Sequence, residues 1–172
     1  AFENLVVKES FSTWSTKISF CFKGKEFKGE IPFFGSYNIC NFLSALIVVE
    51  KVTGQIPPQD SWSKVPQIPG RMERVFSPSI SKSLPLVFVD YAHTPHALSS
   101  ALKSLRKEKN RKIWTVFGCG GDRDSQKRPK MAAASHSYSD KTIVTSDNPR
   151  TEPENKIFAD ILSGFPNNYS AH

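Results

Sequence analysis

The sequence has few cysteines and no long apolar run. Its only cysteines are Cys21, Cys40 and Cys119, and no two of them have the C-x-x-C spacing. Because three cysteines cannot all pair within one chain, we expect reduced thiols, with neither a disulfide scaffold nor a zinc site. No apolar stretch approaches the roughly 18 residues that a membrane-spanning helix needs. Residues 1–5 also lack a basic segment that leads into an apolar one. We therefore expect a cytoplasmic protein that does not insert into a membrane.

The composition is that of a globular protein rather than a disordered or fibrous one. The chain has 172 residues, of which 38% are apolar and 23% are charged, enough for one domain or for parts of two. Its net charge of +7 is uneven, since residues 1–70 have seven Lys against six acidic residues, and residues 71–172 have sixteen Lys or Arg against ten. Part of this excess is a basic run at the end of a predicted helix, formed by Lys103, Arg106, Lys107, Lys109, Arg111 and Lys112. No aromatic residue alternates with this run for base stacking, so we expect a solvated helix end and no nucleic-acid partner.

The first part of the chain alternates in the manner of β-strands and then becomes helical in period. Residues 14–22 and 26–31 alternate around a Lys-Gly-Lys turn, which predicts a β-hairpin with one buried face. Residues 37–51 have the apolar spacing of a packed helix, which Gly54 closes. Four prolines follow between Gln55 and Gly70, and this stretch predicts a domain boundary near residue 70.

The second part alternates apolar strands with helical segments. We predict strands at 86–89, 112–117 and 142–145 and helices at 95–107, 126–138 and 154–162. This alternation is typical of an α/β fold whose parallel sheet is covered on both faces. Ligands of such sheets bind at the carboxyl ends of the strands, where the loops 90–95, 118–123 and 147–150 lie. The sequence therefore predicts a site made by three loops.

The loop Asp147-Asn-Pro-Arg150 has the residues of a carboxylate site. Asn-Pro restricts the backbone before Arg150, and the guanidinium offers a planar fork of donors that matches a carboxylate. The alternative is an ordinary loop arginine in a surface ion pair. Gly118, Gly120 and Gly121 either adopt backbone conformations closed to other residues and bring amides to an anion, or form a plain strand-to-helix turn.

Four further residues have two interpretations each. Asp90 at a strand end either contacts a ribose hydroxyl or caps the helix that begins near Pro95. His93 either serves as an acid or base or is a satisfied hydrogen-bonding residue, and a single histidine does not predict base catalysis. Asn38 and Asn41 share a helix face, where one is a candidate cap and both are candidates to bind an adenine edge.

Taken together, five motifs in order resemble the Mur ligase family, and most closely its branch that adds diaminopimelate. The motifs cover nearly the whole chain and are Tyr37-Asn-Ile-Cys-Asn41, Gly70-Arg-Met-Glu73, Asp90-Tyr-Ala-His-Thr-Pro95, Gly118-Cys-Gly-Gly-Asp-Arg-Asp124 and Asp147-Asn-Pro-Arg-Thr151. The resemblance implies an ATP- and Mg²⁺-dependent amide ligase of bacterial peptidoglycan synthesis. Such a monomeric enzyme joins meso-diaminopimelate to UDP-N-acetylmuramoyl-L-alanyl-D-glutamate through an acyl phosphate.

The resemblance also assigns site residues. Asn38, Asn41, Arg71 and Asp90 would bind the nucleotide, with Arg71 at an interdomain hinge, while Arg123, Asp147, Asn148 and Arg150 would bind the incoming amino acid. It assigns no catalytic residue and no metal ligand to this chain. Arg150 favours diaminopimelate over lysine. Lysine lacks the second carboxylate of diaminopimelate, and a buried guanidinium without that partner costs several kcal/mol.

The chain also departs from the family pattern. It contains no Gly-x-x-Gly-Lys-Thr phosphate loop, no match to the carbamylated lysine or the uridine-binding domain, and no Gly-Lys-Gly-His-Glu segment. Ser36 and His96 replace the residues expected there. We therefore expect a fragment that is inactive alone. It would comprise the end of the central ATPase domain with a linker (1–69) and an incomplete, Rossmann-like C-terminal domain with a mainly parallel sheet (70–172). The alternatives are a lysine-adding, folylpolyglutamate-forming or cyanophycin-forming relative, or a non-enzymatic nucleotide-binding module.

Overall fold

The computed structural model describes residues 2–10, 15–75, 85–107, 111–167 and 169. Trp14, Lys109, Ala171 and His172, which entered the sequence predictions, lie outside the described residues. The chain divides by compactness into two units, Ala1–Tyr91 and Ala92–His172. The domain boundary near residue 70 stays a prediction. Among the helices that the structure describes, none is long and apolar enough to cross a bilayer.

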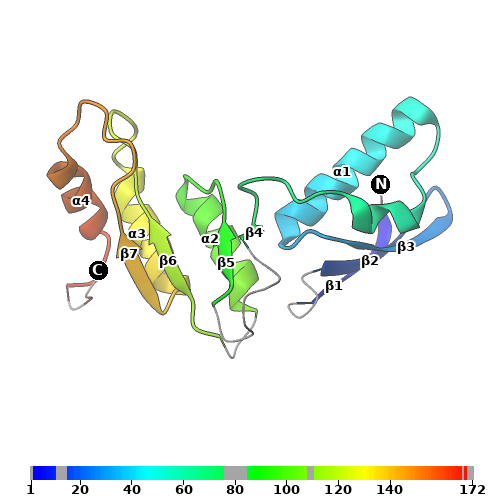
Figure 1. The fold of residues 1–172 in the computed structure, drawn as a ribbon, viewed down its shortest axis with the longest axis horizontal. Coiled ribbons are helices and arrows are strands. Elements are labelled where there is room, and N and C mark those ends of the chain that lie inside the picture. The colour runs from blue at the N-terminus through cyan, green and yellow to red at the C-terminus, as the bar shows by residue number, and fades with distance from the viewer. Residues whose placement is uncertain (1, 11–14, 76–84, 108–110, 168, 170–172) are drawn as a thin grey trace. The chain divides into compact units, whose positions relative to one another are not determined.

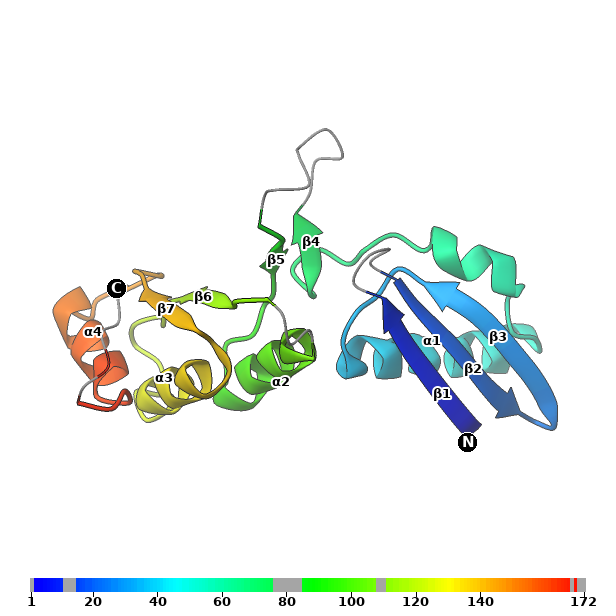
Figure 2. The same cartoon turned by 90° about the horizontal axis from the view of Figure 1, so that it is seen from below.

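The first unit contains an antiparallel sheet of three strands in the order β1-β2-β3 (Figures 1 and 2). Its strands are β1 (Glu3–Ser10), β2 (Ser15–Phe22) and β3 (Lys25–Ile31). The predicted hairpin is confirmed, because Phe22 pairs with Lys25 across a turn in which Lys23 and Gly24 both have positive φ. Strand β1 was not predicted. Its register against β2 shifts between Glu3 and Val6, which interrupts the period of two that identifies a strand.

The predicted helix is present as α1 (Ser36–Thr53), and it covers one face of this sheet (Figure 2). It ends as predicted at Gly54, which has φ 78° and whose N–H donates to the carbonyl oxygen of Glu50. The core that helix and sheet share consists of Ile18, Phe20, Phe22, Ile31, Phe33, Ile39, Phe42, Leu43, Leu46 and Trp62. Burial of these apolar side chains stabilises the unit.

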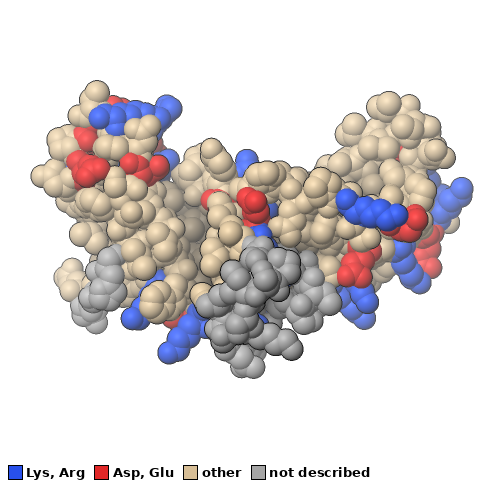
Figure 3. Space-filling view, viewed as in Figure 1, with Lys and Arg blue, Asp and Glu red and all other residues tan. Residues whose placement is uncertain are grey.

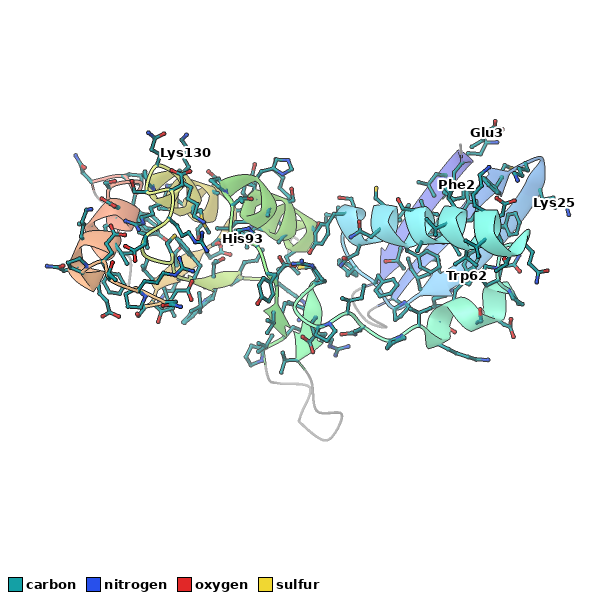
Figure 4. The ribbon with its side chains drawn as sticks, turned by 90° about the horizontal axis from the view of Figure 1, so that it is seen from above. Phe2, Glu3, Lys25, Trp62, His93 and Lys130 are labelled. Atoms are coloured by element: carbon teal, nitrogen blue, oxygen red, sulfur yellow. The ribbon has the colours of Figure 1, made fainter. Side chains whose placement is uncertain are left out.

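The proline-rich segment not only connects two elements but also contributes a side chain to this core. It contains the 3₁₀ helix η1 (Gln59–Lys64), from which Trp62 packs into the core with only 1% of its surface exposed (Figure 4). The indole stacks on Phe20 with 5.9 Å between ring centroids and contacts Phe42 edge to face at 5.5 Å. A glycine makes room for it, because a Cβ at Gly29 would lie 2.4 Å from the Trp62 ring.

The predicted strand at 86–89 has a different partner from the one expected. Strand β5 (Val87–Val89) pairs antiparallel with β4 (Glu73–Val75) in a two-stranded sheet. Val87 and Val89 are exposed. In the part of the chain that the structure describes, β5 has its ladder hydrogen bonds with β4 and not with the parallel strands, so the expectation that it begins the parallel sheet is wrong. An antiparallel partner close in the chain needs no crossover helix, whereas a parallel partner does.

The second unit has the predicted alternation of strands and helices. Its elements are α2 (Pro95–Arg106), β6 (Trp114–Phe117), α3 (Lys127–Tyr138), β7 (Lys141–Val144) and α4 (Glu154–Leu162) (Figure 1). Strands β6 and β7 are parallel, in register from Trp114 with Lys141 to Phe117 with Val144, which confirms the parallel pairing. The core consists of Leu98, Leu102, Ile113, Phe117, Cys119, Met131, Ala132, Ala134, Ile157, Ile161 and Phe165.

Only one face of the β6–β7 pair is covered in the described part of the unit. Thr115 and Phe117 are buried against the core, whereas Trp114 and Val116 on the opposite face are 59% and 61% exposed. The ammonium of Lys141 lies 4.8 Å from the Trp114 ring centroid. The expectation of a sheet covered on both faces is therefore wrong for these two strands.

Candidate ligand site

The candidate nucleotide residues belong to the first unit and the candidate amino-acid residues to the second. On α1, Asn38 is buried and its amide nitrogen donates to the carbonyl oxygens of Phe34 at 2.9 Å and Arg71 at 3.2 Å. Asn41 is exposed, although it lies three positions further along the helix. The helix begins after Gly35 with no side-chain cap, so the interpretation of Asn38 or Asn41 as a cap is wrong. Asn38 instead joins the start of α1 to the backbone at Arg71.

Asp90 is held by two donors of the same unit. Its Oδ2 accepts hydrogen bonds from the hydroxyl of Tyr37 at 2.6 Å and from the backbone N–H of Met72 at 2.9 Å. Burial, together with the bond to Asp90, raises the pKa of Tyr37 far above its usual range, so the tyrosine remains a donor. The other oxygen, Oδ1, has no partner among the described residues.

The alternative role of Asp90 as a helix cap is wrong. Helix α2 begins at Pro95, and its N-cap is Thr94, whose side-chain oxygen accepts a hydrogen bond from the N–H of Ala97 at 3.2 Å. His93, which precedes this cap, is exposed, and its carbonyl oxygen accepts a hydrogen bond from Lys127 Nζ at 3.0 Å (Figure 4). This bond involves the backbone of His93 and gives its imidazole no catalytic geometry.

Arg71 is exposed beside an aromatic ring. Its guanidinium carbon lies 5.4 Å from the ring centroid of Tyr91, which is itself exposed. Gly70 permits this approach, because it has φ 67° and because a Cβ there would lie 2.8 Å from the Tyr91 ring. Arg71 precedes Met72, whose N–H donates to Asp90, so an exposed cation and the Oδ1 atom of Asp90 belong to the same hydrogen-bonded segment.

In the second unit, the loops that follow β6 and β7 are bonded to each other. We call residues 118–124 and 145–152 the paired loops. The N–H of Gly121 donates to the carbonyl oxygen of Asn148 at 2.9 Å. In return, Oδ2 of Asp122 accepts from both the N–H and the hydroxyl of Thr151, at 3.0 and 2.9 Å. These bonds lower the pKa of Asp122, so it remains ionised at neutral pH.

Two glycines of the paired loops, Gly118 and Gly121, act through close approach. None of Gly118, Gly120 and Gly121 has positive φ, so the prediction of conformations closed to other residues is wrong. A Cβ at Gly121 would lie 1.9 Å from the carbonyl oxygen of Pro149, and one at Gly118 would lie 2.4 Å from that of Thr145. Because the Gly121 amide already donates to Asn148, Gly121 brings backbone to backbone rather than its amide to an anion.

Arg150 lies at the tip of the second paired loop. Its φ of 51° is supported by Asn148, whose side-chain oxygen accepts a hydrogen bond from the Arg150 N–H at 3.2 Å. Its Nη1 donates to the carbonyl oxygen of Gly121 at 2.9 Å, while Nε and Nη2 have no partner in the described part of the chain. Arg150 is exposed, so the premise of a buried guanidinium, on which the preference over lysine rested, is wrong for the described chain.

The other two candidate residues are also exposed. Asp147 packs its Cβ near Gly118, and Arg123 has no partner among the residues that the structure describes. The structure thus brings Asn148 and Arg150 together at Gly121, and among the described residues Arg123 has no bond to either of them. A small hollow beside Asp147 is lined also by Cys119, whose thiol pKa is raised by burial and which therefore stays protonated.

The sequence did not predict the role of Arg128, a buried arginine that bonds to several segments of this region. Arg128 on α3 has no exposed surface, and its Nη1 lies 2.8 Å from Oε1 of Glu152 and 2.7 Å from Oδ2 of Asp160. Its Nη2 lies 2.6 Å from Oε2 of Glu152 and 3.2 Å from the carbonyl oxygen of Gly120. The bonds from Arg128 lower the pKa of Glu152 to about 2. Nothing in the local sequence signals this, because a basic residue in the first turn of a polar helix is usually solvated.

The surface charges do not form one basic area on the face drawn in Figure 3, where Lys and Arg lie next to Asp and Glu. Among the described residues no group of three His, Cys, Asp or Glu side chains is arranged to hold a metal ion.

Comparison with known proteins gives concordant matches. The family model described as "Mur ligase, glutamate ligase domain" matches residues 70–172. A UDP-N-acetylmuramoyl-L-alanyl-D-glutamate–2,6-diaminopimelate ligase of Parasynechococcus marenigrum is 43% identical over 137 residues, which cover 78% of this chain and 27% of the relative. The ligase of the same name from Coxiella burnetii is 45% identical over 139 residues, with 79% and 27% covered. The chain therefore spans about a quarter of the length of these relatives.

Solved structures agree. A structure of a ligase of that name is 36% identical, with a TM-score of 0.59, and the match covers 96% of this chain and 32% of that one. A folylpolyglutamate synthase of Mycobacterium tuberculosis, solved with ADP and AMPPCP, has a TM-score of 0.68 at 23% identity, covering 95% and 36% of the two chains. The second likeness shows the fold alone.

Proposed function

Since the chain belongs to the Mur ligase family, we propose that it forms part of an ATP-dependent ligase. This ligase joins meso-diaminopimelate to UDP-N-acetylmuramoyl-L-alanyl-D-glutamate in peptidoglycan synthesis. The single observation that carries this proposal is Arg150, whose guanidinium is anchored through Nη1 to Gly121 while its remaining donors face solvent at the carboxyl ends of β6 and β7. The names of the relatives agree with this reaction.

The chemistry of the paired loops suits an amino acid with an extra carboxylate. An arginine that is already held at one nitrogen offers Nε and Nη2 to a carboxylate with little loss of side-chain freedom. L-Lysine and diaminopimelate both have a distal ammonium, but L-lysine lacks the carboxylate beside it, so its ammonium would face the guanidinium uncompensated. Because Arg150 is exposed here, we base the preference for diaminopimelate on this repulsion and on the lost bidentate bond, rather than on the cost of burial.

The first unit offers partners for a nucleotide. Asp90 has one carboxylate oxygen, Oδ1, to accept from a ribose hydroxyl, and Arg71 is an exposed cation for phosphate. Asn41 is exposed and fits a base edge, whereas the Asn38 amide nitrogen already donates twice within the unit. We propose that Asn38 supports the segment of Arg71 instead of touching the base. ATP with Mg²⁺ would supply the phosphoryl group for an acyl phosphate of the peptide substrate.

We further propose that this chain does not catalyse ligation by itself. It spans about a quarter of its curated relatives, and its sequence contains no Gly-x-x-Gly-Lys-Thr motif for phosphates. The whole ligase is proposed to act as a monomer in the bacterial cytoplasm.

The test is a titration of the chain with meso-diaminopimelate and, in parallel, with L-lysine, followed by NMR chemical shifts of the paired loops. We expect shifts at Gly121 and Thr151 with diaminopimelate that are absent with lysine and absent in Arg150→Ala. The matched control is Arg111→Ala, an exposed arginine of the same unit, which should bind as the unmodified chain does. Equal binding of lysine, or undiminished binding by Arg150→Ala in a folded chain, would contradict the proposal.

A further inference from the structure

Arg128 fastens three segments of the second unit with one side chain. Its two terminal nitrogens hold Glu152 in a bidentate pair, and they also reach Asp160 on α4 and the carbonyl oxygen of Gly120. The guanidinium thus bonds to both paired loops and to the helix that follows them. Lys130, two positions along α3, is by contrast exposed and points outward (Figure 4).

Stability alone does not explain such a cluster. Taking a guanidinium and carboxylates out of water costs free energy, and apolar side chains of similar volume often stabilise a fold equally well or better. The cluster is also imperfect, because Nε of Arg128 is buried without a hydrogen-bond partner among the described residues. What an arginine supplies and an apolar side chain cannot is a fixed geometry between the groups that it bonds.

Hydrogen bonds connect Arg128 through Glu152 to the candidate site. Oε2 of Glu152, held by Arg128, also accepts the backbone N–H of Asp122 at 3.1 Å. Asp122 in turn holds Thr151 through two hydrogen bonds. Thr151 follows Arg150 in the chain, so the distance between the Arg150 guanidinium and the first paired loop depends on a chain of bonds that starts at Arg128.

We propose that Arg128 is a positioning residue of the ligand site. It sets the separation of the paired loops, and thereby the direction in which Arg150 presents its unbonded donors, without touching the ligand itself. Two carboxylates, those of Glu152 and Asp160, pair with its single positive charge, so Arg128 itself presents no net positive charge to a ligand. That the ligand is an amino acid with an extra carboxylate rests on the proposed function.

The test uses Arg128→Lys in the full 172-residue chain, because lysine keeps the charge and loses the bidentate fork. Three amides report on the paired loops, namely those of Gly121, Asp122 and Thr151. We expect their hydrogen exchange to become about tenfold faster while the amides of β6 and α3 keep their protection. Affinity for meso-diaminopimelate should fall by about tenfold, since loosened support misplaces the guanidinium.

The matched control is Arg106→Lys. Arg106 also bridges elements of this unit, with Nη1 at 2.9 Å from Asp140 Oδ2 and Nε at 3.1 Å from the carbonyl oxygen of Tyr138, but it bonds to neither paired loop. Its replacement should leave exchange of the three loop amides unchanged. Faster exchange throughout the unit in Arg128→Lys would show a merely structural role and overturn the proposal, as would unchanged exchange at the loops.

Glu152→Gln decides the question if Arg128→Lys fails to fold, because glutamine keeps the shape but replaces one of the two oxygens that accept from Arg128 by a donor. Local opening of the paired loops in this variant supports the proposal, and unfolding of both variants overturns it. Failure of the unmodified chain to bind meso-diaminopimelate would count against the proposed function instead, and the exchange of the three amides would still decide the role of Arg128.

Discussion

The hydroxyl of Tyr37 lies 2.6 Å from Oδ2 of Asp90 and donates a hydrogen bond to it, which ties the start of α1 to the segment after β5. The same oxygen accepts the N–H of Met72, whose φ of 48° is unusual for a residue with a side chain. Asp90 therefore holds together the first unit at the residues proposed for the nucleotide, while its other oxygen is left for a ligand.

Replacing Tyr37 by Phe should lower the free energy of unfolding by about 1–2 kcal/mol, because Asp90 loses a donor in a half-buried position. Urea unfolding followed by circular dichroism measures this. The control is Tyr138→Phe, since the half-buried Tyr138 packs under Lys103 and its hydroxyl has no partner among the described residues. Equal losses in the two variants would contradict a role for the Tyr37–Asp90 bond.

Two neighbouring glycines should differ in their tolerance of alanine. A Cβ at Gly121 would lie 1.9 Å from the Pro149 oxygen, whereas one at Gly120 would be at an ordinary distance of 3.5 Å from the Asn148 oxygen. Gly121→Ala should therefore force the paired loops apart, at a cost of about 1–3 kcal/mol, and weaken binding of meso-diaminopimelate. Gly120→Ala should change neither quantity measurably. Thermal unfolding and ligand titration of both variants test the contrast, and a tolerated Gly121→Ala would refute the close approach.

The pairing of Glu152 predicts a specific acid dependence. Its pKa is about 2 in the folded chain, below the ordinary 4.5, chiefly because Arg128 bonds to the ionised form. The group therefore stabilises the fold fully above about pH 4.5, and this contribution is lost as the pH falls towards 2. The Tm difference between the unmodified chain and Glu152→Gln should be constant from pH 7 to 5 and shrink below pH 4. A difference that persists undiminished to pH 2 would contradict this assignment.

The cap of α2 gives a fourth prediction. Thr94→Ala removes the side-chain acceptor of the Ala97 N–H and should destabilise the second unit by about 1 kcal/mol. Thr94→Ser keeps that acceptor and should cost little. Guanidinium unfolding of both variants measures the difference, and identical midpoints would show that the backbone at Pro95 starts the helix without the cap.

Features that depend on neighbours in the chain were predictable from the sequence. The turn at Lys23 and Gly24, the end of α1 at Gly54 and the parallel strands β6 and β7 all follow from local period and turn residues. The candidate site was predictable where a short motif sets its own geometry. Asn148 and Arg150 hydrogen-bond as the Asn-Pro turn suggests.

Features that depend on side chains far apart in the sequence were not predictable. Arg128 finds Glu152 and Asp160 at separations of 24 and 32 residues, and no periodic pattern records such a pairing. The same holds for Trp62, whose proline-rich surroundings suggested a linker although its ring completes a core. The sequence left two roles for Asp90, a helix cap or a ribose contact, because it does not show that Thr94 caps α2 or that Tyr37 bonds to Asp90.

The contrast between the two described tryptophans has an optical consequence. Trp62 is shielded within the first unit, whereas Trp114 lies in water beside the ammonium of Lys141. In a chain with Trp14 replaced by Phe, the blue-shifted part of the fluorescence therefore belongs to Ala1–Tyr91 and the red-shifted part to Ala92–His172. Iodide, drawn to Lys141, will quench the red-shifted emission first, so one spectrum separates the melting of the two units.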